Sequence, residues 1–93
     1  MKNQKLYVLV RKDLSKSQQA VQAGHAVAEY LLHGPATTWN NGTLIYLGVS
    51  NEQELVDWGD KLEKYVGFRE PNVDNQLMAI ATEENKFNGL RLL

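Results

Sequence analysis

Four polar side chains recur at helical spacing within residues 15–32, SKSQQAVQAGHAVAEYLL. They are Gln18, Gln22, His25 and Glu29, at steps of four, three and four residues. At about 100° per residue they fall within roughly 60° of one another, so they form one stripe on a helix. An imidazole in such a stripe is well placed to bind a substrate or relay a proton. The alternative is that His25 is a semi-buried residue bonded to a neighbour, and that Gln18 only caps the helix.

Apolar residues at steps of three and four predict the buried side of this helix. They are Ala20, Val21, Gly24, Val27, Ala28 and Leu31. On this arrangement His25 lies at the edge of the buried side, next to Val21 and Leu32. The helix is expected to start at Asp13 or Ser15 and to end at Gly34, which precedes a proline.

The other elements needed to position this stripe can be read from hydrophobic patterning. Residues 5–11 (KLYVLVR) predict a largely buried strand, and residues 43–50 predict a second. Asn51 and Glu54 have capping-box spacing, which predicts a second helix ending at Gly67. Residues 67–71 and 76–83 predict two further strands joined by a tight loop. The sequence therefore predicts a single α/β domain over residues 1–93, with a mixed four-stranded sheet and helices packed on its faces.

Charge is distributed unevenly, although the formal net charge is only −1. The first sixteen residues contain five basic side chains and one acid, and residues 86 and 91 make the tail basic. Nine acids oppose three basic residues between positions 51 and 84. If the first strand, the start of the first helix and the tail meet, they form a local phosphate-binding surface. The alternative is ordinary solvated surface charge.

Several functional classes lack the residues they need. The chain has no cysteine, which excludes disulfides and thiolate metal sites. His25 and His33 are eight residues apart with no acidic cluster, so no metal ligands and no cofactor are predicted. No glycine-rich phosphate loop or nucleophile elbow is present. The absence of a long apolar run predicts no membrane segment, and no signal peptide is recognised; we expect a cytoplasmic protein.

Two motifs carry a resemblance to a known family. VLVRKDL, followed within ten positions by AVQAGHA, is similar to the opening of the type 2 (archaeal and eukaryotic-type) peptidyl-tRNA hydrolases. The matching positions are Val10, Arg11, Asp13, Leu14, Ala20, Gln22, His25 and Ala26. LIYLGVSNEQEL, FREPNVDNQLMAIA and LRLL resemble later segments of the family, so the likeness spans nearly the whole chain.

The resemblance implies metal-independent cleavage of the ester between a peptide and the tRNA 3′ end, by a homodimer. It implies peptidyl-tRNA as the partner and catalytic roles for Lys16, His25 and Glu70. The residues that we expect to bind the substrate are Arg11, Lys12, Asp13, Gln18, Gln22 and Asn72. Glu70 also has a plainer interpretation, as a surface acid paired with Arg69 or Lys64.

Gln18 stands at the position of the family's catalytic lysine, and Gln76 and Met78 replace its threonines. These differences keep a second function open: a non-catalytic relative that binds RNA or a protein partner through the same cleft. A third hypothesis is an α/β domain that binds a small ligand and no nucleic acid.

Overall fold

A buried strand, β1 (Lys5–Arg11), lies at the centre of the computed structural model, which describes residues 4–93. It pairs in parallel with β2 (Thr43–Val49) and antiparallel with β4 (Gln76–Thr82). The outer strand β3 (Val66–Glu70) is antiparallel to β4, which gives the order β2-β1-β4-β3. The predicted mixed four-stranded sheet is therefore confirmed.

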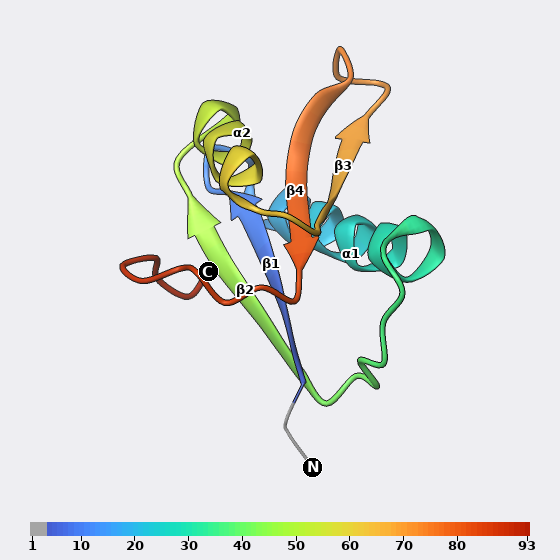
Figure 1. Ribbon diagram of the computed structural model, residues 1–93. Helices are drawn as coiled ribbons and strands as arrows, with labels where there is room; N and C mark the ends of the chain where they lie inside the picture. The colour runs from blue at the N-terminus through green and yellow to red at the C-terminus, as the bar shows by residue number, and fades with distance from the viewer. Residues whose placement is uncertain (1–3) are drawn as a thin grey trace.

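Two helices cover opposite faces of this sheet (Figure 1). On one face, α1 (Lys16–His33) packs Ala23, Ala26 and Tyr30 against alternate residues of β1 and β4. On the other face, α2 (Glu52–Lys61) packs Leu55 against the intervening residues of the same strands. Successive side chains of β1 thus pack into two separate cores, one on each face, as expected of a central strand covered on both sides. Within residues 4–93, neither helix is long and apolar enough to cross a membrane.

The buried side of α1 differs from the predicted one. The side chains that face the sheet belong to Gln22, Ala23, Ala26 and Tyr30. At ~100° per residue this side is rotated by about 140° from the predicted apolar side. Val21 is 47% exposed, Leu31 52% and Leu32 73%, so the largest aliphatic side chains face solvent. The small side chains of Ala23 and Ala26 let the helix lie close to the sheet, and helical periodicity alone did not distinguish that option.

The predicted end of α2 is also wrong. The helix begins as expected, with the Asn51 side chain accepting the Glu54 N–H at 3.0 Å. It ends at Lys61 instead of Gly67, because Leu62 adopts an extended conformation and is buried. Gly67 lies within β3, where an added Cβ would be 2.7 Å from Leu77 Cδ1. The glycine therefore permits close strand packing, and it is not a helix stop.

Three strands end at one edge of the sheet. β3 runs in the same direction as β1 and β2, because β4 is antiparallel to both of its neighbours. The carboxyl ends of β1, β2 and β3, at Arg11, Val49 and Glu70, therefore share an edge, which we call the carboxyl edge. The connection that leaves β1 enters α1 on one face, and the connection that leaves the neighbouring β2 enters α2 on the other face. Such a divergence commonly places ligand sites at this edge.

Candidate active site

A contact between α1 and β3 brings together two of the predicted site residues. Gln22 is 2% exposed, and its Nε2 donates to Glu70 Oε2 at 3.4 Å and to Gln18 Oε1 at 3.3 Å. Its Oε1 is buried and accepts no hydrogen bond from residues 4–93. Turning the amide over would point an oxygen at the Glu70 carboxylate, so the contacts themselves fix its orientation. A buried acceptor without a donor is rare in folded proteins and marks a place to look for function.

His25 packs on Phe68 of β3, two residues before Glu70. Its ring stacks on Phe68 with centroids 4.4 Å apart and planes 9° from parallel. Phe68 and Glu70 are two residues apart on one strand, which separates them by roughly 7 Å. The packing that holds the imidazole therefore comes from Phe68. Val21 and Leu32, expected to provide it, are exposed. His25 itself is exposed, and no hydrogen bond to it is found within the described chain.

Glu70 is placed where β3 turns back into β4. One carboxylate oxygen faces Gln22, and the other accepts the backbone N–H of Asn72 at 3.4 Å. The turn is closed by N–H groups of Val73 and Asn75, both bonded to the Glu70 carbonyl at 3.1 Å. The plainer interpretation of Glu70 finds no support, because no ion pair joins it to either expected cation in the described residues. Arg69 instead donates to the Asn75 carbonyl.

Arg11 and Asp13 form a closed unit at the end of β1. Two guanidinium nitrogens bind the two Asp13 oxygens at 2.9 and 2.8 Å, and the third donates to Gln76 Oε1 at 2.9 Å. The Asp13 hydrogen bond raises the pKa of Arg11, and the Arg11 hydrogen bond lowers the pKa of Asp13. Arg11 is only 8% exposed. This geometry favours a positioning role for Arg11 over direct contact with phosphate.

The predicted cationic residues are not gathered at Glu70. Lys16 is the exposed first residue of α1, and six helical positions place it about 120° around the axis from Gln22. Lys12 lines a separate hollow near the end of β2, together with Arg91 of the tail. Lys2, also counted in the basic N-terminal segment, lies outside the described residues. Of the catalytic set predicted from the sequence, His25 packs on Phe68, two residues from Glu70 on β3, while no ion pair joins Lys16 to Glu70 within residues 4–93.

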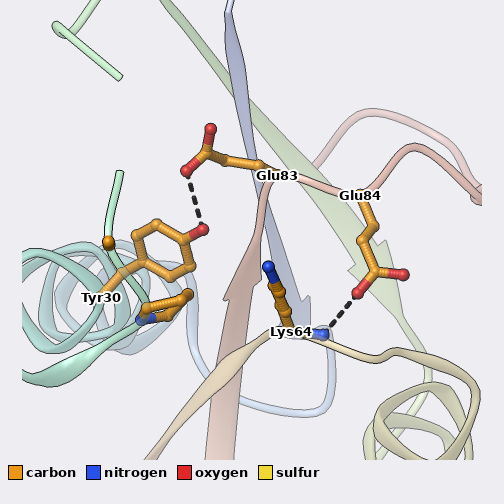
Figure 2. Close-up of a pocket in the computed structure, with 6 residues that line it drawn as sticks. Tyr30, Lys64, Glu83 and Glu84 are labelled. Carbon is orange, nitrogen blue, oxygen red and sulfur yellow. Dashed lines mark hydrogen bonds between the residues drawn. The ribbon is translucent and has the colours of Figure 1, made fainter. Parts of the chain in front are cut away.

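A second feature, which the sequence did not reveal, lies at the opposite edge of the sheet. A hollow of about 260 Å³ lies between the end of α1 and the start of β3. Figure 2 shows residues that line it. Tyr30 donates to Glu83 at 2.8 Å, and the Lys64 side chain extends between Tyr30 and Glu84 (Figure 2). Burial and the neighbouring Glu83 carboxylate raise the pKa of Tyr30. Thr37 also donates to Glu83, so this carboxylate ties α1 and the following loop to the end of β4.

Hydrogen bonds explain most of this second feature. Glu84 accepts the N–H groups of Glu63 and Lys64, and chiefly the latter contact lowers its pKa. Tyr30 and Glu83 are 53 residues apart, so local sequence spacing could not predict their contact. Neither this hollow nor the one beside Lys12 is lined by Gln22, His25 or Glu70. In the cluster formed by Gln18, Gln22, His25 and Glu70, Gln22 is buried and Glu70 half-buried, whereas Gln18 and His25 are exposed.

The groups of this cluster suit a polar substrate, and they do not form a recognisable metal site. Within residues 4–93 no group of three His, Asp or Glu side chains has metal-binding geometry. Glu70 offers a carboxylate that is held at both oxygens, while the exposed amide of Gln18 and the ring of His25 lie on the same side of α1. Proton transfer, hydrogen bonding and stacking are the chemistry that these groups provide.

Comparison with known proteins adds no assignment. The chain matches no protein-family model and no curated protein.

Proposed function

We propose that this protein hydrolyses the ester that joins a peptide to the 3′ end of tRNA. The observation that carries the proposal is the buried Gln22 amide, which holds Glu70 against the polar stripe of α1. The contact lies at the carboxyl edge, where Arg11 donates to Gln76, the residue of β4 that pairs with Glu70. The resemblance implied the Arg11–Asp13 unit for the substrate site. On this proposal the protein acts in the cytoplasm and works as a homodimer.

Ester hydrolysis requires a positioned water, a proton acceptor and donors for the developing oxyanion. Glu70 is the proton acceptor: Gln22 and the Asn72 N–H hold its two oxygens, leaving lone pairs for a water molecule. The water attacks the ester carbonyl and gives its proton to Glu70. Collapse of the tetrahedral intermediate breaks the bond to the ribose oxygen, which takes that proton from Glu70. The products are the tRNA 3′-hydroxyl and the carboxylic acid of the peptide, which releases its remaining proton to water.

Gln18 and His25 supply binding around this reaction. The Gln18 side chain uses its oxygen to accept from Gln22, which leaves its NH₂ group for the carbonyl oxygen of the substrate. One face of the His25 ring is covered by Phe68, while the residue remains exposed. We assign the open face to stacking on a base at the tRNA 3′ end, as aromatic side chains do in RNA recognition.

Lys16 takes a weaker role than the resemblance implied. Lys16 is exposed and forms no ion pair with Glu70 within residues 4–93, so we assign it long-range positive charge that attracts the polyanionic substrate. Charge supplied in this way speeds encounter with the substrate more than the chemical step.

Glu70→Gln tests the proposal, since it keeps the shape of the side chain and removes the proton acceptor. We expect kcat on purified peptidyl-tRNA to fall by roughly 10²–10⁴-fold. The matched control is Glu29→Gln, the same change on the polar stripe, at a carboxylate that bonds to His33. Full activity in Glu70→Gln, or an inactive parent protein, would contradict the assignment.

The second candidate is a non-catalytic relative that binds RNA or a protein through the same surface. Gln18 favours it, because an amide cannot supply the charge or proton transfer of a lysine. Binding of tRNA without any turnover would select this candidate. RNA binding that weakens steeply with salt would in turn exclude a site for small neutral ligands.

A further inference from the structure

The hollow beside Lys12 lies at the carboxyl edge, beyond the end of β2. It has a volume of about 210 Å³, and its lining includes Lys12, Glu54 and Arg91. We propose that this hollow binds a phosphodiester group of the RNA part of the substrate. That the ligand is tRNA rests on the proposed function. That the ligand is an anion rests on the side chains that line the hollow.

The charges that line the hollow favour an anion. Lys12 follows β1 and Arg91 belongs to the C-terminal tail, so the chain brings two distant cations to one place. Neither cation forms an ion pair within residues 4–93. The single carboxylate, from Glu54, accepts the backbone N–H of Ser50 at 2.6 Å. Two cations therefore face one acid that is already hydrogen-bonded, and the lining has a net positive charge.

Backbone contacts hold both cations in position. The Lys12 N–H donates to the Val49 carbonyl at 2.7 Å, and the Lys12 side chain crosses directly over Gly48. A Cβ at position 48 would overlap that side chain. On the other side, the Gly48 N–H donates to the Arg91 carbonyl at 3.0 Å, which fastens the tail along β2. Lys12 and Arg91 are thus both hydrogen-bonded through their backbones to the end of β2. Such a preorganised arrangement lowers the entropic cost of binding.

The position of the hollow relative to Glu70 suits a nucleic-acid strand. In the order β2-β1-β4-β3, the ends of β2 and β3 are three strand spacings apart, or roughly 14 Å. A tRNA 3′ end that lies across the carboxyl edge would place its ester at Glu70 and an upstream phosphate between Lys12 and Arg91. A free phosphate ion would occupy the hollow without reaching Glu70, so the two sources can be separated by experiment.

The experiment measures binding of deacylated tRNA to the intact protein by fluorescence anisotropy at several salt concentrations. Lys12→Ala and Arg91→Ala should each weaken binding roughly two- to fivefold, as expected for exposed charge pairs. Each should also reduce the slope of log K against log salt by about 0.7, the value for one single-stranded phosphate contact. The control is Lys5→Ala, which removes the same charge at the opposite end of β1 and should change neither quantity.

Gly48→Ala provides a test that alters no charge. It displaces the Lys12 side chain and should weaken tRNA binding as much as Lys12→Ala does. Unchanged binding in both Lys12→Ala and Arg91→Ala, or equal weakening in Lys5→Ala, would overturn the inference. So would binding of inorganic phosphate, detected by calorimetry, in a protein that binds no tRNA. Binding of tRNA at the hollow without ester cleavage would instead leave the inference intact and refute the proposed hydrolase.

Discussion

Replacing Gln22 with methionine should separate stability from activity. The amide makes two hydrogen bonds of 3.3 and 3.4 Å, longer than the usual 2.9–3.0 Å for N–H···O. Each therefore contributes at the low end of the normal range, about 0.5 kcal/mol. Its Oε1 is buried without a donor among the described residues, which costs about 1–3 kcal/mol.

Methionine has a similar length and volume, and it carries no amide to leave unsatisfied. Gln22→Met should therefore raise the free energy of unfolding by about 1 kcal/mol, or Tm by about 4–8 °C in a domain of this size. Glu70 loses its side-chain donor at the same time. We expect kcat/KM on peptidyl-tRNA to fall at least tenfold, because the carboxylate is no longer held in place.

Urea unfolding followed by tryptophan fluorescence gives the stability, and single-turnover hydrolysis gives the activity. The matched control is Gln19→Met, one position from the polar stripe of α1. Gln19 donates to the Leu14 carbonyl at 2.8 Å, so its loss should destabilise by about 1 kcal/mol without affecting hydrolysis. A Gln22→Met protein that is less stable than its parent by more than about 1 kcal/mol would refute the energetic reasoning. A stabilised protein with full activity would remove Gln22 from the site.

Three other predictions concern the rest of the molecule. Tyr30→Phe removes a part-buried bond to Glu83 and should cost about 1.5 kcal/mol in urea unfolding while hydrolysis is unchanged; a loss below about 0.5 kcal/mol would mean that the bond is not formed in solution. Asp13→Asn should cost roughly 0.5 kcal/mol at pH 7, since the Asp13 side chain is 40% exposed. Arg11 lowers the Asp13 pKa, so the stability difference between the parent and Asp13→Asn should be complete above the usual aspartate pKa of about 3.9. It should disappear as the pH falls through the lowered pKa. A stability difference that grows on acidification would contradict the ion pair. Light scattering should give twice the chain mass if the proposed homodimer forms, and Leu32→Glu should reduce that mass if the exposed side of α1 is the contact.

Local signals in the sequence were sufficient for most of the fold. The run from Lys5 to Arg11 predicts β1 with its observed bounds, because a strand covered on both faces is continuously apolar. Asn51 and Glu54 predict the start of α2 for an equally local reason, the geometry of the cap. Where two local signals competed, the sequence misled: Gly67 is typical of a helix end, but close packing against Leu77 decides its place in β3.

The candidate site was predicted less completely, because its geometry depends on contacts across the chain. Gln22, His25 and Glu70 were named from the sequence, and α1 and β3 bring them together. Nothing in local spacing indicated that Phe68 would support His25, or that Arg11 would be enclosed by Asp13 and Gln76. Lys16 lies about 120° around the axis of α1 from Gln22, the residue that bonds to Glu70, and it forms no ion pair with Glu70 within residues 4–93.

The choice of buried face on α1 is itself an argument about function. The observed orientation of α1 buries Ala23, Ala26 and Tyr30 against the sheet. It also buries Gln22 Oε1 without a donor among the described residues, which costs about 1–3 kcal/mol. An apolar side chain at position 22 would avoid that cost, but it could not donate a hydrogen bond to Glu70. Departures from the expected pattern are most often found at functional sites, where a less stable arrangement is retained for its chemistry. We infer that the contact between Gln22 and Glu70 is retained for its role at the site, and that a search for substrate should begin there.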